Sequence, residues 1–365
     1  MRSSTGQHFV ALDHLRAFAA LMVVSWHFLH FSDGTPVPFD GAPIFFPLAL
    51  IDEGHTGVAL FMVLSGYLFA KLLDGKDIYY PNFIWNRFIR LAPLLILTFA
   101  AVGCGRYING DNLNDFAVKL LRGFVYPVWP NGGWSVATEL HFYVALPILL
   151  FLAKKSRLML LGVIITAIVF RAYYYYSVGE VQSLAYWTIF GRIDQFVLGM
   201  LALFFAREIR DRVKFLPVIL IGFTIFWWWF DVTGGFYGRP RYPSNSTIWI
   251  FIPTFEGLAY AAFVVWYDSR KINVRSISSQ LLQKLGEYSY SIYLLHFFVV
   301  FKVAAFIHRN IMDISNIYIG CFWATIFFVT MIIPGYLSHR FIESPFLQLR
   351  LNYIKQPAQQ VKGLY

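Results

Sequence analysis

Two ionisable side chains, Arg16 and His27, lie in one apolar segment near the start of the chain. The eleven-residue separation is close to three full helical turns at about 100° per residue, so both side chains project from the same helix face. They lie about 16 Å apart along the helix axis. A permanently charged guanidinium suits a phosphate, whereas an imidazole accepts and returns a proton near neutral pH. Alternatively, Arg16 reaches a lipid headgroup and His27 satisfies a hydrogen bond in packed protein.

A carboxylate, Glu139, follows Trp134 and Ser135 in another apolar segment, at a predicted depth comparable to that of His27. A buried carboxylate must be paired or protonated. If Glu139 meets His27, it orients the ring and stabilises the imidazolium, as the third group of a catalytic triad does. The alternative is a structural pair with an arginine or a histidine.

Arg87 and Arg90 are three residues apart and precede Pro93, at the start of a further apolar segment. Short basic loops normally stay in the cytoplasm, which alone explains two arginines at this position. The sharper hypothesis is a phosphate clamp that lies opposite Arg16.

Five more polar or aromatic side chains are candidates for the lining of the same cavity, because polar groups are costly in the hydrocarbon layer. Arg192 and Asp194 are two residues apart, so they do not share a helix face, and each is expected to pair with another helix. His296 either lines the cavity or bonds a backbone carbonyl. The spacing of His and Glu residues matches no metal motif, so we predict no metal site. The predicted lining residues are Trp134, Ser135, Arg192, Asp194 and His296.

The composition indicates which elements position these residues. Only 14% of the 365 residues are charged, against about 25% in soluble domains, and 58% are hydrophobic. We therefore predict an all-α, polytopic bundle of about ten membrane-spanning helices with the bilayer as its surroundings. The net charge is +10, and the basic residues lie in short clusters between apolar segments, as membrane topology explains. Nucleic acid is therefore not indicated as a partner. The predicted spans are 12–31, 55–73, 91–108, 134–153, 158–176, 185–206, 215–231, 247–267, 286–307 and 315–337.

The charges of the loops predict the orientation. With both termini in the cytoplasm, 18 of the 30 Lys and Arg residues fall in internal segments and 6 in external ones. This bias agrees with the positive-inside rule. The internal segments are 74–90, 154–157, 207–214, 268–285 and the C-terminal tail. We predict one membrane domain over residues 1–345 and a short cytoplasmic tail over 346–365.

At these residues the chain resembles the acyltransferase-3 family of integral membrane acyltransferases, which includes bacterial polysaccharide O-acetyltransferases. The resemblance is spread over six motifs that occur in the family's order. Two departures stand out: Glu139-Leu140-His141 replaces a frequent Glu-Glu-Gln, and Ala59 replaces a frequent polar residue. The motifs are Leu12–Arg16 with Trp26-His27, Gly57–Leu68, Arg87–Pro93, Trp134–Tyr143, Ser289–His296 and Phe341–Pro345.

The resemblance implies a multi-pass protein of the bacterial cytoplasmic (inner) membrane. It further implies transfer of an acyl group, most often acetyl from acetyl-CoA, to a hydroxyl of a cell-surface carbohydrate such as O-antigen, exopolysaccharide or a lipo-oligosaccharide. No cofactor is expected, since acyl-CoA is a substrate. Arg16, with Arg87 and Arg90, would bind the phosphates of the donor. His27 would be essential, either as a base towards the acceptor hydroxyl or as the site of an acyl-enzyme, and Glu139 would assist it.

A membrane transporter or flippase for a glycan or an acyl-linked intermediate is the alternative. Such a protein would also hold buried charges in a multi-helix cavity. Transporters commonly show repeated halves or pairs of broken helices, and the sequence shows neither. The sequence does not specify the acceptor sugar and its hydroxyl, the length of the acyl chain, the oligomeric state, or the role of Glu256.

Overall fold

The computed structural model describes residues 8–30, 34–39, 41–206, 208, 215–238 and 242–355, and these residues contain helices but no strand. The predicted all-α class is confirmed. The first half of the chain contains α1 (Val10–Leu29), η1 (Phe46–Leu48), α2 (Ala49–Asp52), η2 (Gly54–Thr56), α3 (Gly57–Leu73), α4 (Tyr80–Ile108), α5 (Leu113–Arg122), α6 (Gly133–Lys155) and α7 (Met159–Val178). The second half contains α8 (Gln182–Trp187), α9 (Ile189–Phe204), α11 (Leu216–Val232), α12 (Gly235–Gly238), η4 (Thr247–Ile250), α13 (Ile252–Asp268), α14 (Ile277–Glu287), α15 (Ser289–Leu295), η5 (His296–Phe298), α16 (Val300–Asn310), α17 (Ile317–Thr330), α18 (Ile332–Ser338), η6 (His339–Glu343) and α19 (Ser344–Leu347).

The chain is a multi-pass membrane protein. Within the described residues, five helices are long and apolar enough to cross a bilayer, and a sixth span results if the pair Ser289–Phe298 and Val300–Asn310, bent by 58°, crosses once. The number of ten spans and the orientation of the termini stay predictions. The last helical span ends at Leu347, ten residues beyond the predicted end, because the helix continues through polar residues that have no hydropathy signal. The five helical spans are Gly54–Leu73, Tyr80–Ile108, Gly133–Lys155, Met159–Val178 and Ile317–Leu347.

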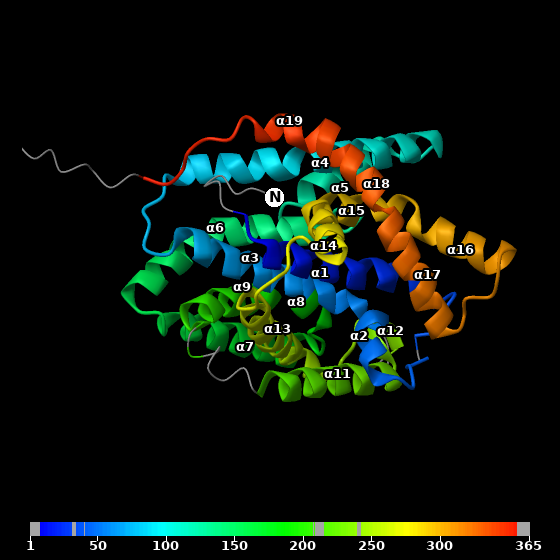
Figure 1. Cartoon of the computed structure of the whole chain (residues 1–365), viewed down its shortest axis with the longest axis horizontal. Helices are drawn as coiled ribbons and strands as arrows, with labels where there is room; N and C mark the ends of the chain where they lie inside the picture. Colours follow the sequence, from blue (N-terminus) through cyan, green and yellow to red (C-terminus); the bar gives the residue numbers. More distant parts are fainter. Residues whose placement is uncertain are drawn as a thin grey trace, which may run out of the picture.

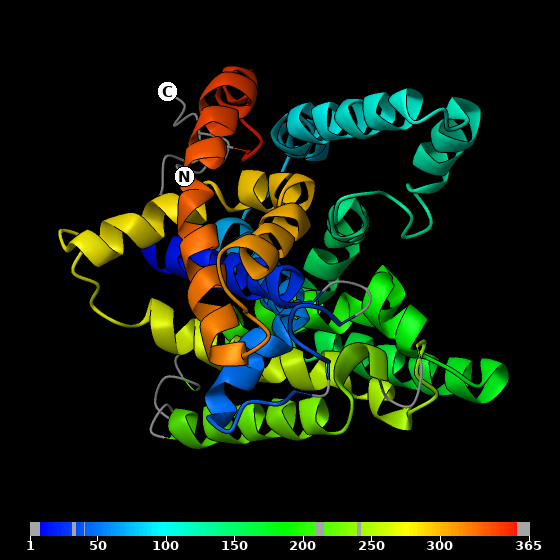
Figure 2. The same ribbon diagram turned by 90° about the vertical axis from the view of Figure 1, so that its right-hand side faces the viewer.

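Helix α1 crosses the centre of the molecule, with α3 beside it and α14, α15 and α17 around it (Figure 1). Fifteen of its twenty residues are buried. In contrast, α4 and α5 reach away from the other helices (Figure 2), and α4, α6 and α7 keep large apolar side chains such as Ile96, Ile148 and Ile165 exposed. Such side chains suit contact with lipid.

Small residues bring α3 and α9 into close contact. A Cβ atom added at Gly66 of α3 would lie 1.9 Å from the backbone oxygen of Phe196, and one added at Gly199 of α9 would lie 2.1 Å from that of Val63. The two helices therefore touch through their backbones at both positions. The sequence favours this packing role for the small residues of 57–67, since small side chains allow close helix approach in membranes.

Several segments predicted to be internal meet at one end of the bundle. Lys154, in the last turn of α6, bonds Asp77 in the loop after α3 at 2.7 Å, and Lys71 of α3 bonds Asp268 at the end of α13 at 2.6 Å. The loop predicted at 207–214 lies outside the described residues except for Glu208, as does the end of the tail from 356. The side of the membrane that this end faces stays a prediction.

We predict that Gly66→Ala destabilises the protein by about 1–3 kcal/mol, because the new methyl group overlaps the backbone of α9. Thermal unfolding of the purified protein in detergent measures the effect. Gly162→Ala in α7 is the matched control, since nothing lies within 4 Å of its added Cβ atom. Equal unfolding temperatures for the two variants would contradict the close α3–α9 contact.

Candidate active site

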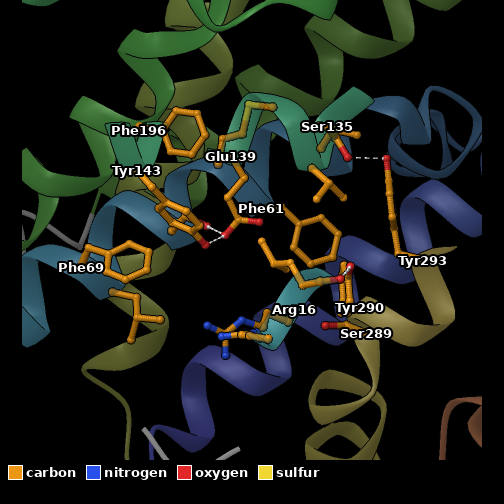
Figure 3. Close-up of a pocket in the computed structure, with 17 residues that line it drawn as sticks. Arg16, Phe61, Phe69, Ser135, Glu139, Tyr143, Phe196, Ser289, Tyr290 and Tyr293 are labelled. Carbon is orange, nitrogen blue, oxygen red and sulfur yellow. Dashed lines mark hydrogen bonds between the residues drawn. The ribbon is translucent and has the colours of Figure 1, made fainter. Parts of the chain in front are cut away.

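A cavity of about 90 Å³ lies between α1, α3, α4, α6, α9 and the segment around α15 (Figure 3). Apolar side chains of α3, α4, α6 and α9 line it together with two arginines, one carboxylate and several hydroxyl groups. The lining residues are Arg16, Val58, Phe61, Met62, Ser65, Leu68, Phe69, Arg90, Leu91, Ser135, Val136, Glu139, Tyr143, Phe196, Ser289, Tyr290 and Tyr293.

Arg16 and Arg90 form the cationic part of the cavity wall. Arg16 donates to Asp13 one turn earlier at 2.9 Å, and the exposed fraction of its side chain is 15%. Arg90 is half-buried. Arg87, one turn before Arg90, does not line the cavity: it is buried, and its guanidinium lies over the rings of Phe69 and Phe83 at 5.2 and 5.5 Å. The structure therefore places Arg16 and Arg90, but not Arg87, where they can reach a ligand in the cavity.

Glu139 points into the cavity from α6 (Figure 3). Its Oε1 accepts hydrogen bonds from the Tyr143 hydroxyl, one turn along the same helix, and from Ser65 of α3 at 3.4 Å. The expected contact with His27 is not formed. That expectation was wrong in this structure because Glu139 and His27 have different neighbours: Glu139 shares the cavity with Arg16, whereas His27 lies outside its wall.

His27 pairs with His296 instead. Its Nδ1 lies 2.8 Å from the Val23 carbonyl, which can only accept, so Nδ1 carries the proton. His296 Nδ1 lies 3.2 Å from the Ile292 carbonyl and therefore also carries a proton. His296 Nε2 is then an acceptor, and it lies 3.4 Å from His27 Nδ1. No described residue bonds His27 Nε2, so its lone pair is available as a base or a nucleophile.

Aromatic side chains connect this histidine pair to the cavity. Tyr293 lines the cavity, its ring centroid lies 6.0 Å from that of His296, and the His296 centroid lies 5.1 Å from that of His27. Tyr293 also accepts a hydrogen bond from Ser135 at 2.8 Å and contacts the Phe61 ring at 6.2 Å. Arg16 and His27 thus share a helix but not a cavity wall, and the side chains of Tyr293 and His296 lie between the cavity and His27.

Comparison with known proteins identifies the family. Residues 9–339 match the family model described as an acyltransferase domain, Acyl_transf_3. The chain belongs to the acyltransferase-3 family. No solved structure matches it.

Three relatives from this comparison are distant in sequence. "Putative O-acetyltransferase SAR0937" of Staphylococcus aureus strain MRSA252 is 25% identical over 94% of this chain and 59% of its own length. "Putative membrane-bound transacylase BcsY" of Komagataeibacter xylinus is 25% identical over 69% of this chain and 68% of its own length. "Nodulation protein 10" of Rhizobium leguminosarum is 26% identical over 39% and 44%, respectively. The chain therefore spans about three fifths of the staphylococcal relative.

Of the other residues predicted to line the cavity in this member of the family, only Ser135 is among the described residues that line it. Trp134 is buried against Tyr186 and Trp187, and His296 lies behind Tyr293. Arg192 donates to the Tyr186 carbonyl at 2.5 Å, where α8 ends and leaves carbonyls without helical partners. Asp194 accepts from Arg171 of α7. No group of three or more His, Cys, Asp or Glu side chains in the described part of the chain is placed to hold a metal ion.

Sequence reasoning missed several residues of this region. The sequence predicts only a role in helix packing for Ser65, yet its hydroxyl donates a hydrogen bond to Glu139 in the cavity. Tyr143 and Tyr293 looked like parts of motifs without a role of their own, because aromatic residues are frequent in this chain. Glu256, whose role the sequence left open, accepts hydrogen bonds from Thr56 at 2.6 Å and Gln195 at 2.9 Å, which explains how it is buried.

The pair of Arg171 and Asp194 is fully buried, and Arg171 also donates to the carbonyls of Ile250 and Gly191. Removing one member leaves a buried charge, so we predict that Arg171→Met lowers the free energy of unfolding by about 3–5 kcal/mol. Lys154→Met, which breaks an exposed ion pair with Asp77, should cost at most about 1 kcal/mol. Denaturation of both variants in the same detergent gives the comparison, and similar losses would show that the buried pair is not structural.

Proposed function

We propose that this acyltransferase transfers an acyl group, most often acetyl, from a cytoplasmic acyl-CoA to a hydroxyl of a cell-surface carbohydrate, across the inner membrane of a bacterium. The observation that carries the proposal is the arrangement along α1: a cavity with Arg16 and Arg90 in its wall, and beyond Tyr293 a histidine whose Nε2 bonds none of the residues that the structure describes. The names of the staphylococcal relatives, which are O-acetyltransferases by name, support an oxygen acceptor.

The cationic wall suits the donor. Guanidinium groups bind phosphates through paired hydrogen bonds, and Arg16 and Arg90 face the same space. The apolar lining residues of α3, such as Phe61, Leu68 and Phe69, suit the uncharged arm that carries the thioester. Glu139, with its partners Ser65 and Tyr143, lies beside this arm in the proposal and has no direct role at His27.

In the direct version of the reaction, His27 Nε2 removes the proton from the acceptor hydroxyl while its oxygen attacks the thioester carbonyl. The carbon–sulfur bond breaks, and the imidazolium returns the proton to the departing thiolate. Because Nδ1 donates to the Val23 carbonyl, the ring is held with Nε2 as the reacting atom. Since Tyr293 and His296 lie between the cavity wall and His27, the thioester reaches His27 only when Tyr293 moves.

In the second version, His27 Nε2 attacks the thioester carbonyl, the carbon–sulfur bond breaks and CoA leaves as the thiolate, so that His27 becomes an acyl-imidazolium that keeps its Nδ1 proton. The acceptor hydroxyl then attacks the acyl carbon, the bond from that carbon to Nε2 breaks, the ester forms and neutral His27 is restored, while the hydroxyl proton passes to water and balances the released thiolate. This version needs no donor and acceptor in contact at the same time, which suits substrates on opposite sides of a membrane.

We predict that His27→Ala lowers the rate at which cell-surface glycans are O-acetylated by about 10²–10⁴-fold, the usual contribution of a base or nucleophile, and therefore lowers their O-acetyl content. Arg16→Ala should lower it through weaker donor binding. Glycan analysis of cells with equal amounts of each variant in the membrane measures both. His308→Ala, in the half-exposed pair with Asp313, is the control and should retain wild-type acetylation. Unchanged acetylation in both His27→Ala and Arg16→Ala would remove the enzyme hypothesis and leave the transporter alternative.

A labelled acyl group separates the two versions. If His27 is acylated, incubation of the purified protein with radiolabelled acetyl-CoA and no acceptor should label the protein, and the label should be absent in His27→Ala. The His308→Ala variant should be labelled like wild type. A single turnover that forms product without any protein-bound label would favour direct transfer.

A further inference from the structure

Among the described residues, donors reach only one of the two oxygens of the Glu139 carboxylate. Tyr143 and Ser65 both donate to Oε1, and no described residue donates to Oε2. Oε2 is also not enclosed by protein, unlike the unbonded carboxylate oxygens of Asp52 and Asp194. Since Glu139 lines the cavity, Oε2 is an acceptor that a molecule in the cavity can use.

Arg16 and Glu139 project into the same cavity from opposite sides (Figure 3). Arg16 forms its ion pair with Asp13 at 2.9 Å, and no ion pair between described residues includes Glu139. Glu139 also carries the only carboxylate among the described residues that line the cavity. A ligand between the two charges must donate a hydrogen bond to Oε2, because a carboxylate oxygen that loses water without gaining a donor costs free energy.

Glu139 lies midway along the face of α6 that lines the cavity. About 6 Å along the helix axis separate it from Ser135 on one side and from Tyr143 on the other. Ser135 bonds Tyr293, the residue next to the histidine pair. The ring of Tyr143 lies 5.3 Å from that of Phe69, and an arginine of α4 covers the Phe69 ring. A donor that extends from the arginines towards Tyr293 therefore passes Glu139.

The chemistry of the donor supplies the missing hydrogen bond. The arm of coenzyme A between the phosphates and the thioester contains two secondary amides, each with an N–H group. These groups lose water when the arm enters the cavity, so each needs an acceptor there. A carboxylate forms shorter and stronger hydrogen bonds than a neutral acceptor does. Oε2 of Glu139 is thus the strongest acceptor that the described lining residues offer to an amide of the arm.

We propose that Glu139 binds the pantetheine arm of the acyl-CoA donor, with Oε2 accepting a hydrogen bond from an amide N–H of the arm. The inference rests on the proposed function, since it assigns one contact of the donor. Ser65 and Tyr143 are positioning residues, because their hydroxyl groups occupy Oε1 and thereby hold the carboxylate. Glu139 then favours thioesters whose arm carries an amide over thioesters of simple thiols.

The test pairs a change in the protein with a change in the donor, using full-length protein in detergent. The donors are acetyl-CoA and two analogues, in each of which an ester oxygen replaces the N–H of one amide of the arm. For Glu139→Leu, the KM for acetyl-CoA should rise about tenfold with little change in kcat, as expected for the loss of one hydrogen bond to a charged group. With the analogue that lacks the bonded N–H, the wild type should show the same rise and Glu139→Leu no further one.

Further variants test the geometry of the contact. Glu139→Gln should lose less affinity than Glu139→Leu, since an amide oxygen still accepts but carries no charge. Tyr143→Phe and Ser65→Ala should each reduce the factor by which the protein prefers acetyl-CoA to that analogue. Glu180 is the matched control: it is half-buried like Glu139, accepts from the Ser183 N–H at 3.2 Å and is not one of the lining residues. Glu180→Leu should keep the wild-type preference.

An equal rise of KM with all three donors in Glu139→Leu would overturn the inference, because the defect would then be structural. An unchanged KM for acetyl-CoA would also overturn it, and so would a fall in kcat alone, which would place Glu139 at the reacting atoms. If the wild type itself neither binds nor uses acetyl-CoA, the proposed function fails, an outcome that the wild-type measurement reveals before any variant is compared.

Discussion

A charged side chain inside an apolar helix bundle must either meet a counter-charge or face a polar space, and this constraint shapes the whole structure. Arg171 follows the first course: Asp194 and two backbone carbonyls occupy its guanidinium in a fully buried site. Arg16 and Arg90 follow the second course, since both open onto the cavity, although Arg16 also has Asp13 as a partner. The fully satisfied arginine stabilises the fold, whereas the arginines at the cavity remain able to bind a ligand.

Close backbone packing keeps that polar space narrow. Gly66 and Gly199 let α3 and α9 touch, and the added Cβ atom at Gly57 would lie only 2.5 Å from the Ala19 carbonyl of α1. Hydrophobic attraction between helices is weak in lipid, so such contacts and hydrogen bonds provide the association energy. A central helix held this firmly, with Arg16 near one end and His27 near the other, fixes the spacing between the cavity wall and the histidine pair.

The sequence predicted the elements better than the contacts between them. The predicted spans fall mostly on helical residues, because runs of apolar residues report burial in lipid or protein, but 185–206, 247–267 and 286–307 are each divided among separate helices. The face shared by Arg16 and His27 follows from helical geometry, but the partner of Glu139 does not, since the spacing along one helix carries no information about which side chain of another helix it meets. Arg171 was overlooked beside the tyrosine run 173–176. The packing of residues 349–355 along α4 was also overlooked, because hydrogen bonds to backbone groups and to the side chain of Asn86 leave no hydropathy pattern.

The break after α15 ties these parts together. Tyr293, His296, Phe297 and Phe301 follow one another at steps of three, one and four residues, so they lie on one side of the bent pair of helices. That side covers His27, whose ring centroid lies 4.5 Å from Phe297 and 6.1 Å from Phe301. The same element that carries His296 to His27 also carries Tyr293 to the cavity wall, so a small rotation of α15 would change the access of the cavity to His27 and the support of the histidine ring together.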